Sequence, residues 1–166
     1  MSSPRTAGAS RPVLATASEL YAEALALETE AADRYADLAD QMETHNNREV
    51  AGLFRKLADI EARHAAALRG RAGVSLVGAG GGSRLLNERP ETAPLGEAHY
   101  LMTPAHALQL ALAGEERAEA FFRGLARTGA DAEVRRLAAA FADEEHEHIE
   151  LLRAWLAKYP APQSGW

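Results

Sequence analysis

The chain has 166 residues, 47% of them hydrophobic and 25% charged, which is enough to bury one core without disulfides or a structural metal. Its 24 acidic and 18 basic residues give a net charge of -6, which argues against nucleic-acid binding. The sequence has no run of about 18 apolar residues, so it predicts no membrane span. It contains no cysteine, which excludes disulfides, thiolate metal sites and iron–sulfur clusters and fits the cytoplasmic location that we expect.

Alanine and leucine dominate the sequence and indicate an all-α fold. The first predicted helix covers residues 18–42. Thr16 and Glu19 have the spacing of a capping box at its start. Its apolar residues recur at intervals of three and four and form one stripe, made of Leu20, Ala24, Leu27, Ala31, Tyr35 and Leu38.

The second predicted helix covers residues 48–68. Asn46 or Asn47 can cap its start, and Gly70 can end it. Only a short link joins this helix to the first one. Such a link favours antiparallel packing of the two helices.

The third predicted helix covers residues 104–128, after Thr103 as the N-cap and with Pro104 at the first helical position. The fourth covers residues 132–158, after Asp131 as the N-cap. The link between these two helices is also short, so we expect a second antiparallel pair.

A long segment, residues 70–102, separates the two helix pairs and is rich in glycine. Two helical hairpins joined by one long crossover form the ferritin-like four-helix bundle. We therefore expect one bundle domain over residues 16–159, with a disordered N-terminal tail at residues 1–15 and a C-terminal tail at residues 160–166.

The two predicted hairpins resemble each other in sequence. Shifting residues 24–39 by 87 places them on the third helix, where seven of 16 positions are identical and Glu28 falls on Glu115. Shifting residues 49–64 by 84 places them on the fourth helix, again with seven of 16 positions identical. The repeat predicts a bundle with pseudo-two-fold symmetry, in which equivalent residues face each other.

Each half carries one Glu-x-x-His motif and one glutamate within its apolar stripe. Residues three apart lie on one helix face, so the carboxylate and the imidazole of each motif can reach one ion. An unpaired carboxylate in a bundle core costs on the order of several kcal/mol, and no lysine or arginine occupies a matching stripe position. A metal is the simplest counter-charge. The candidate ligands are Glu28, Glu61, His64, Glu115, Glu145 and His148.

Four glutamates and two histidines are the ligand set of a carboxylate-bridged di-iron site. Oxygen-rich ligands with two imidazoles suit two iron ions, or an iron–manganese pair. Four carboxylates also balance the charge of two divalent ions. The alternative is a salt-bridged core without metal.

These residues resemble the rubrerythrin branch of the ferritin-like superfamily, over about residues 19–155 apart from the crossover. The segment 28–35 is similar to the first-helix pattern of that family, a ligand glutamate seven residues before a tyrosine. Segments 113–115 and 144–148 are similar to the patterns of its third and fourth helices. The resemblance implies that Glu28 and Glu115 each bind mainly one metal. It implies that Glu61 and Glu145 bridge the two metals. His64 and His148 would cap the site.

Two departures from that family bear on the chemistry. Rubrerythrins carry a further glutamate one turn past the third-helix ligand, which is used when iron shifts during peroxide reduction. This chain has Ala118 there, and Glu119 lies one residue off the face. Rubrerythrins also carry a cysteine-ligated rubredoxin iron, whereas this chain has no cysteine and needs an external electron donor.

For other residues near the motifs, we expect structural roles or exposed positions. Tyr35 is expected to fill the core, with donation of an electron or a hydrogen bond near the metals as the alternative. Five glutamates are expected on the solvated face, with a place beside the metals or on the path of a metal ion as the alternative for one or two of them. They are Glu30, Glu116, Glu119, Glu144 and Glu147.

The sequence thus supports three hypotheses of function. The first is a non-haem di-iron oxidoreductase, a homodimer in which the six residues bind the metals and act as the catalytic groups that reduce hydrogen peroxide or dioxygen. The second is iron storage or detoxification of the bacterioferritin type, which needs a hollow shell of many subunits. The third is a metal-free bundle that serves assembly or partner binding.

Overall fold

The structure of the chain is a computed structural model that describes residues 16–72 and 101–159. Within these ranges it has no strand and four helices, which are α1 (Ala17–Thr44), α2 (Arg48–Ala72), α4 (Pro104–Thr128) and α5 (Ala132–Leu156). The two predicted tails and most of the predicted crossover, residues 73–100, lie outside the described residues. None of these four helices is long and apolar enough to cross a membrane.

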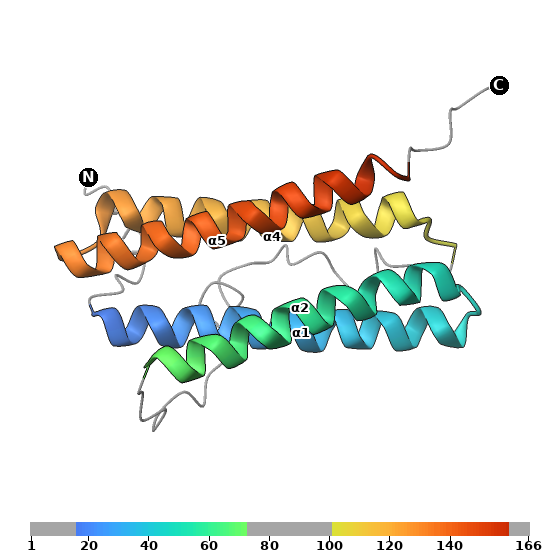
Figure 1. Cartoon of the computed structure of the whole chain (residues 1–166), viewed down its shortest axis with the longest axis horizontal. Coiled ribbons are helices and arrows are strands. Elements are labelled where there is room, and N and C mark those ends of the chain that lie inside the picture. The colour runs from blue at the N-terminus through green and yellow to red at the C-terminus, as the bar shows by residue number, and fades with distance from the viewer. Residues whose placement is uncertain (1–15, 73–100, 160–166) are drawn as a thin grey trace, which may run out of the picture.

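The helices form two layers, one of α1 and α2 and the other of α4 and α5 (Figure 1). Within each layer the two helices pack closely and run antiparallel, as their short links predict. Helices α2 and α4 run in the same direction, so that α2 ends at one end of the bundle and α4 begins at the other. The predicted all-α four-helix bundle with two antiparallel helix pairs is confirmed.

Three of the helices begin at the capping residues that the sequence predicts. Thr16 and Glu19 form a complete capping box at the start of α1, with both hydrogen bonds at 3.2 Å. Thr103 and Asp131 each accept a hydrogen bond from the backbone N–H three residues further on. These caps satisfy backbone donors that the first turn of a helix leaves without partners.

The structure corrects the predictions at the ends of α2 and α5. Helix α2 continues through Gly70 to Ala72, because glycine can adopt helical dihedral angles as well as the left-handed ones that often end a helix. Helix α5 ends at Leu156, two residues before the predicted end. At the start of α2, the Asn47 side chain donates a hydrogen bond of 2.7 Å to the backbone carbonyl of Met102. It thereby ties the first hairpin turn to the start of α4.

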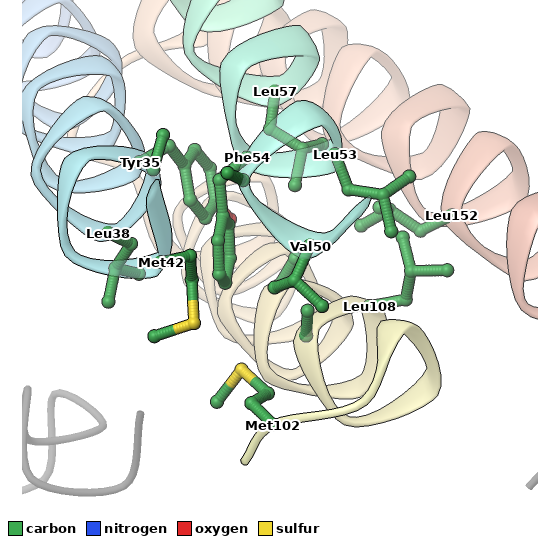
Figure 2. Packing of buried hydrophobic residues seen from close by; sticks show 14 residues of the cluster. Tyr35, Leu38, Met42, Val50, Leu53, Phe54, Leu57, Met102, Leu108 and Leu152 are labelled. Atoms are coloured by element: carbon green, nitrogen blue, oxygen red, sulfur yellow. The ribbon is translucent and has the colours of Figure 1, made fainter. Parts of the chain in front are cut away.

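Apolar side chains form two separate clusters, one toward each end of the bundle. The first, here called the Phe54 cluster, lies where α1 ends and α2 and α4 begin (Figure 2). Its members include Leu38, Met42, Val50, Phe54 and Leu108. The second, the Phe141 cluster, lies at the opposite end and includes Leu20, Leu68, Phe122, Leu137 and Phe141. The middle of each helix lies between the two clusters.

Gly129 occupies a tight position between α4 and α5, and we expect Gly129→Ala to lower the free energy of unfolding by about 1–3 kcal/mol. A β-carbon there would lie 2.8 Å from the backbone oxygen of Leu125 and 3.0 Å from Cγ1 of Val134. Gly124, within α4, is the control, since a β-carbon there meets no atom within 4 Å. Gly124→Ala should stabilise the protein by about 0.5–1 kcal/mol through helix propensity. Urea titration of both variants measures the difference, and equal stability would contradict the expectation.

Candidate metal centre

A polar layer lies between the Phe54 and Phe141 clusters, and the six candidate ligands form it. Helices α1 and α4 provide one glutamate each, and α2 and α5 provide one Glu-x-x-His motif each. Five of the six residues are no more than 7% exposed, whereas His64 is half-buried. The repeat thus places its equivalent polar residues at the same level along the bundle axis.

His148 lies at the middle of this layer. Its Nδ1 atom is 3.5 Å from Oε2 of Glu115, 3.7 Å from Oε2 of Glu145 and 3.8 Å from Oε1 of Glu61. This nitrogen is buried and makes no hydrogen bond. Nitrogen and oxygen atoms that bind one ion at about 2 Å lie roughly 3–4 Å from one another.

The three distances from Nδ1 of His148 fit the ligands of a shared metal ion. Ligand atoms of Glu61, Glu115 and His148 all lie within 4.8 Å of one another. An unsatisfied buried nitrogen among three carboxylates is costly unless a further partner binds it. A cation supplies that partner, and the donor set of carboxylate oxygen and imidazole nitrogen suits iron.

The other candidate ligands are attached to this group. The carboxyl groups of Glu28 and Glu61 lie close enough for each to affect the pKa of the other. Nδ1 of His64 lies 3.2 Å from Nε2 of His148, and the two rings meet edge to face with centroids 4.5 Å apart. The structure thus brings all six predicted residues into one connected cluster.

Burial controls the protonation of the carboxyl groups. It raises the pKa of Glu28 to about 8 and that of Glu61 to about 10, and it also holds the pKa of Glu145 well above its usual value. Burial acts in the same direction on Glu115, but the adjacent His148 imidazole lowers the pKa of this carboxyl overall. Without a metal ion, most of the layer therefore keeps its protons at neutral pH.

Tyr35 connects the layer to the Phe54 cluster. Its hydroxyl donates a hydrogen bond of 3.2 Å to Oε1 of Glu115, and its ring stacks on Phe54 with centroids 6.0 Å apart. Burial and the nearby carboxylates hold the pKa of Tyr35 well above its usual value. The side chain thus fills the core, as expected, and is also a permanent hydrogen-bond donor that orients Glu115.

The glutamates expected on the solvated face differ in exposure. Glu116 and Glu147 are exposed, whereas Glu30, Glu119 and Glu144 are half-buried. Oε1 of Glu119 lies 3.4 Å from a guanidinium nitrogen of Arg123 and 3.2 Å from Nδ1 of His146. These contacts tie the Glu119 carboxylate to two partners that are themselves partly exposed.

One buried carboxyl group escaped the sequence analysis. Glu23 of α1 is 6% exposed, although it lies outside the predicted apolar stripe. In the repeat, the equivalent position is Leu110, which packs against the Phe54 cluster. This apolar counterpart is the signal that predicts a partly buried position for Glu23.

Comparisons with known proteins agree with this fold and with the family that the sequence motifs resemble. Residues 19–74 match the family model described as Rubrerythrin. A crystal structure at 2.00 Å, of an uncharacterized conserved protein from Magnetospirillum magnetotacticum MS-1, is 41% identical to this chain. The alignment covers 90% of this chain and 99% of that one, with a TM-score of 0.69. No curated protein matches the chain.

We expect the metal-free protein to lose stability as the pH rises from 7 to 9. The folded chain holds protons on Glu28 and Glu61 that the unfolded chain, with carboxyl pKa values near 4.5, has already released. Stability is therefore greatest below the unfolded pKa and falls as the pH rises toward the folded values. The Tm should drop by about 5 °C or more over this range.

Thermal unfolding followed by circular dichroism measures this effect. Glu61→Gln removes one titrating proton and should flatten the dependence, whereas Glu147→Gln, at an exposed position of α5, should leave it as in the wild type. A Tm independent of pH between 7 and 9 would show that the carboxyl groups do not hold their protons.

Proposed function

This chain belongs to the rubrerythrin family, and from that premise we propose that it is a non-haem di-iron oxidoreductase. The carrying observation is the buried Nδ1 of His148, which lies without a hydrogen bond among the carboxylates of Glu61, Glu115 and Glu145. Two iron ions are the proposed cofactor, with an iron–manganese pair as the variant that the same oxygen-rich donor set accepts.

Charge balance supports two ions rather than one. The four carboxyl groups carry four negative charges once deprotonated, which two divalent cations neutralise. A single divalent cation would leave two uncompensated charges in a layer that is almost fully buried. Metal binding would therefore displace the protons that burial otherwise holds on Glu28, Glu61 and Glu145.

The contacts also support a division of roles among the ligands. Glu61 contacts Glu28 and lies near His148, and Glu145 contacts Glu115 and lies near His148. Each motif glutamate therefore reaches groups on other helices, as a bridging carboxylate must. We propose that the stripe glutamates, Glu28 and Glu115, are terminal ligands. We propose that His64 and His148 each bind a metal through the imidazole ring.

Two ferrous ions would supply the two electrons that, with two protons, convert hydrogen peroxide to two water molecules, or would pass electrons to dioxygen. The protein contributes a dry, fixed site, since an apolar cluster closes the layer toward each end of the bundle. Tyr35 holds the Glu115 carboxylate in place through its hydroxyl. Since the chain has no cysteine, an external donor would return the electrons.

The route that depends on an extra glutamate has no support in this chain. Position 118 is an alanine, and the Glu119 carboxylate is held by Arg123 and His146. We therefore propose that the ligand set stays the same six residues in both oxidation states. The peroxide and dioxygen reactions of one iron-loaded sample, followed by stopped-flow absorbance, would show which oxidant reacts faster.

Elemental analysis after anaerobic loading with ferrous iron and desalting tests the metal site. We expect about two irons per chain in the wild type, because the layer offers the ligands of two ions. Glu61→Ala and Glu145→Ala should each lose most of the iron, whereas Glu147→Ala, on the exposed face of α5, should keep it. Peroxide added to the loaded wild type should produce near-ultraviolet absorption of a diferric centre.

Two outcomes would overturn the proposal. Folded wild type without bound iron, together with a Glu115→Leu variant that is more stable than the wild type, would favour a metal-free structural bundle. Iron uptake far above two per chain, together with a large hollow particle in sedimentation, would favour storage of the bacterioferritin type. A homodimer with a saturable iron content is the result that we expect.

A further inference from the structure

Helices α2 and α5 lie on the same side of the bundle, nearer to the viewer in Figure 1 than α1 and α4. The rings of His64 and His148 meet between these two helices. On each helix, the residues eight before, one before and three after the histidine are exposed, and helical periodicity places them together on one side. They form what we call the α2–α5 face, made of Lys56, Arg63 and Ala67 of α2 and Ala140, Glu147 and Leu151 of α5.

The repeat relates the two halves of this face to each other, but with opposite charge. Under the shift of 84 residues, Arg63 is the equivalent of Glu147, and the small Ala67 is the equivalent of the large Leu151. Lys56 adds a second positive charge on α2, where α5 has an alanine. The α2 half of the face is therefore basic, and the α5 half is acidic and carries the large apolar side chain.

Arg63 and Glu147 lie at about the same level along the bundle, because each directly precedes one of the two histidines whose rings meet. Within the described part of the chain, neither side chain enters an ion pair. Leu151 is 37% exposed, and no other large hydrophobic residue of the four described helices is exposed. The face thus presents two opposite charges and one apolar side chain to another molecule.

We propose that the α2–α5 face binds a second copy of this chain, with a two-fold axis that runs parallel to α2 and α5. Such an axis places α2 of each copy on α5 of the other, so that Arg63 meets Glu147 of the second copy at two symmetric places. Each chain has a net charge of -6, so two copies repel each other unless the touching surfaces carry opposite charges. The face supplies its own complement, which any other partner would have to match.

The same contact would bury groups that the single chain leaves in water. Leu151 of each copy would lie against α2 of the other, and its burial would favour association. His64, which follows Arg63 and is the one half-buried candidate ligand, would be covered as well. The interface does not require bound metal, and only the benefit of covering His64 rests on the proposed function.

The test is the dissociation constant of the full-length dimer, measured by sedimentation velocity over a series of concentrations. Arg63→Glu and Glu147→Arg should each raise this constant about tenfold or more, because each puts like charges opposite each other at two places. An equimolar mixture of the two variants should form a heterodimer about as tightly as the wild type, because opposite charges then meet again at both places. Asp37→Arg, at an exposed position of α1, is the matched control and should dimerise like the wild type.

A further variant tests the apolar part of the contact. Leu151→Ser should raise the dissociation constant severalfold, because it removes apolar surface that the dimer buries. Circular dichroism shows whether each variant is folded. Recovery of the dimer in the mixture of Arg63→Glu and Glu147→Arg would separately exclude misfolding as the cause of the weaker association.

Three results would overturn this inference. They are a wild type that stays monomeric at every concentration, a dimer that neither charge reversal weakens, and a weakened dimer that the mixture does not restore. In the last case Arg63 and Glu147 would not face each other. None of these results changes the iron content per chain, which tests the di-iron proposal separately.

Discussion

The burial of four carboxyl groups in one layer is the constraint on which this structure depends. Water is nearly excluded from Glu28, Glu61, Glu115 and Glu145, so each negative charge there needs a proton or a cation. Replacing buried charged groups with apolar residues of similar volume is often neutral or stabilising, so this layer is a cost to the stability of the fold unless a cation binds there. The centre of the fold thus requires protons or cations that neutralise four buried carboxylates.

Residues around the layer and residues within it both support the buried carboxylates. Above and below the layer, the Phe54 and Phe141 clusters provide apolar packing that keeps the helices at a fixed spacing. Within the layer, the hydroxyl of Tyr35 and the imidazole of His148 contact Glu115 and favour its charged form. The layer is therefore enclosed by packed apolar side chains, and one of its carboxylates, Glu115, favours the charged form that binds a cation.

Sequence reasoning predicted the helices and the polar layer because both depend on local spacing. The caps at Thr16, Thr103 and Asp131 are short-range contacts, and the repeat relates the ligands of one half to those of the other. The bond from Asn47 to Met102 depends on a contact between distant segments, which spacing does not encode. Burial of Glu23 and half-burial of Glu144 follow from how helices pack, so a single helix pattern could not reveal them.

The distribution of the ligands over the chain has a consequence for folding order. Each hairpin is a local structure with a short loop, and it carries one stripe glutamate and one Glu-x-x-His motif. Docking of the two hairpins closes a much longer loop and is the entropically expensive step. Because neither hairpin alone holds a complete ligand set, a cation bound by both hairpins, as the proposed function requires, would link halves of the chain that are far apart in sequence. Under the proposed function, a chain whose hairpins misdock would therefore hold no redox-active metal ion tightly.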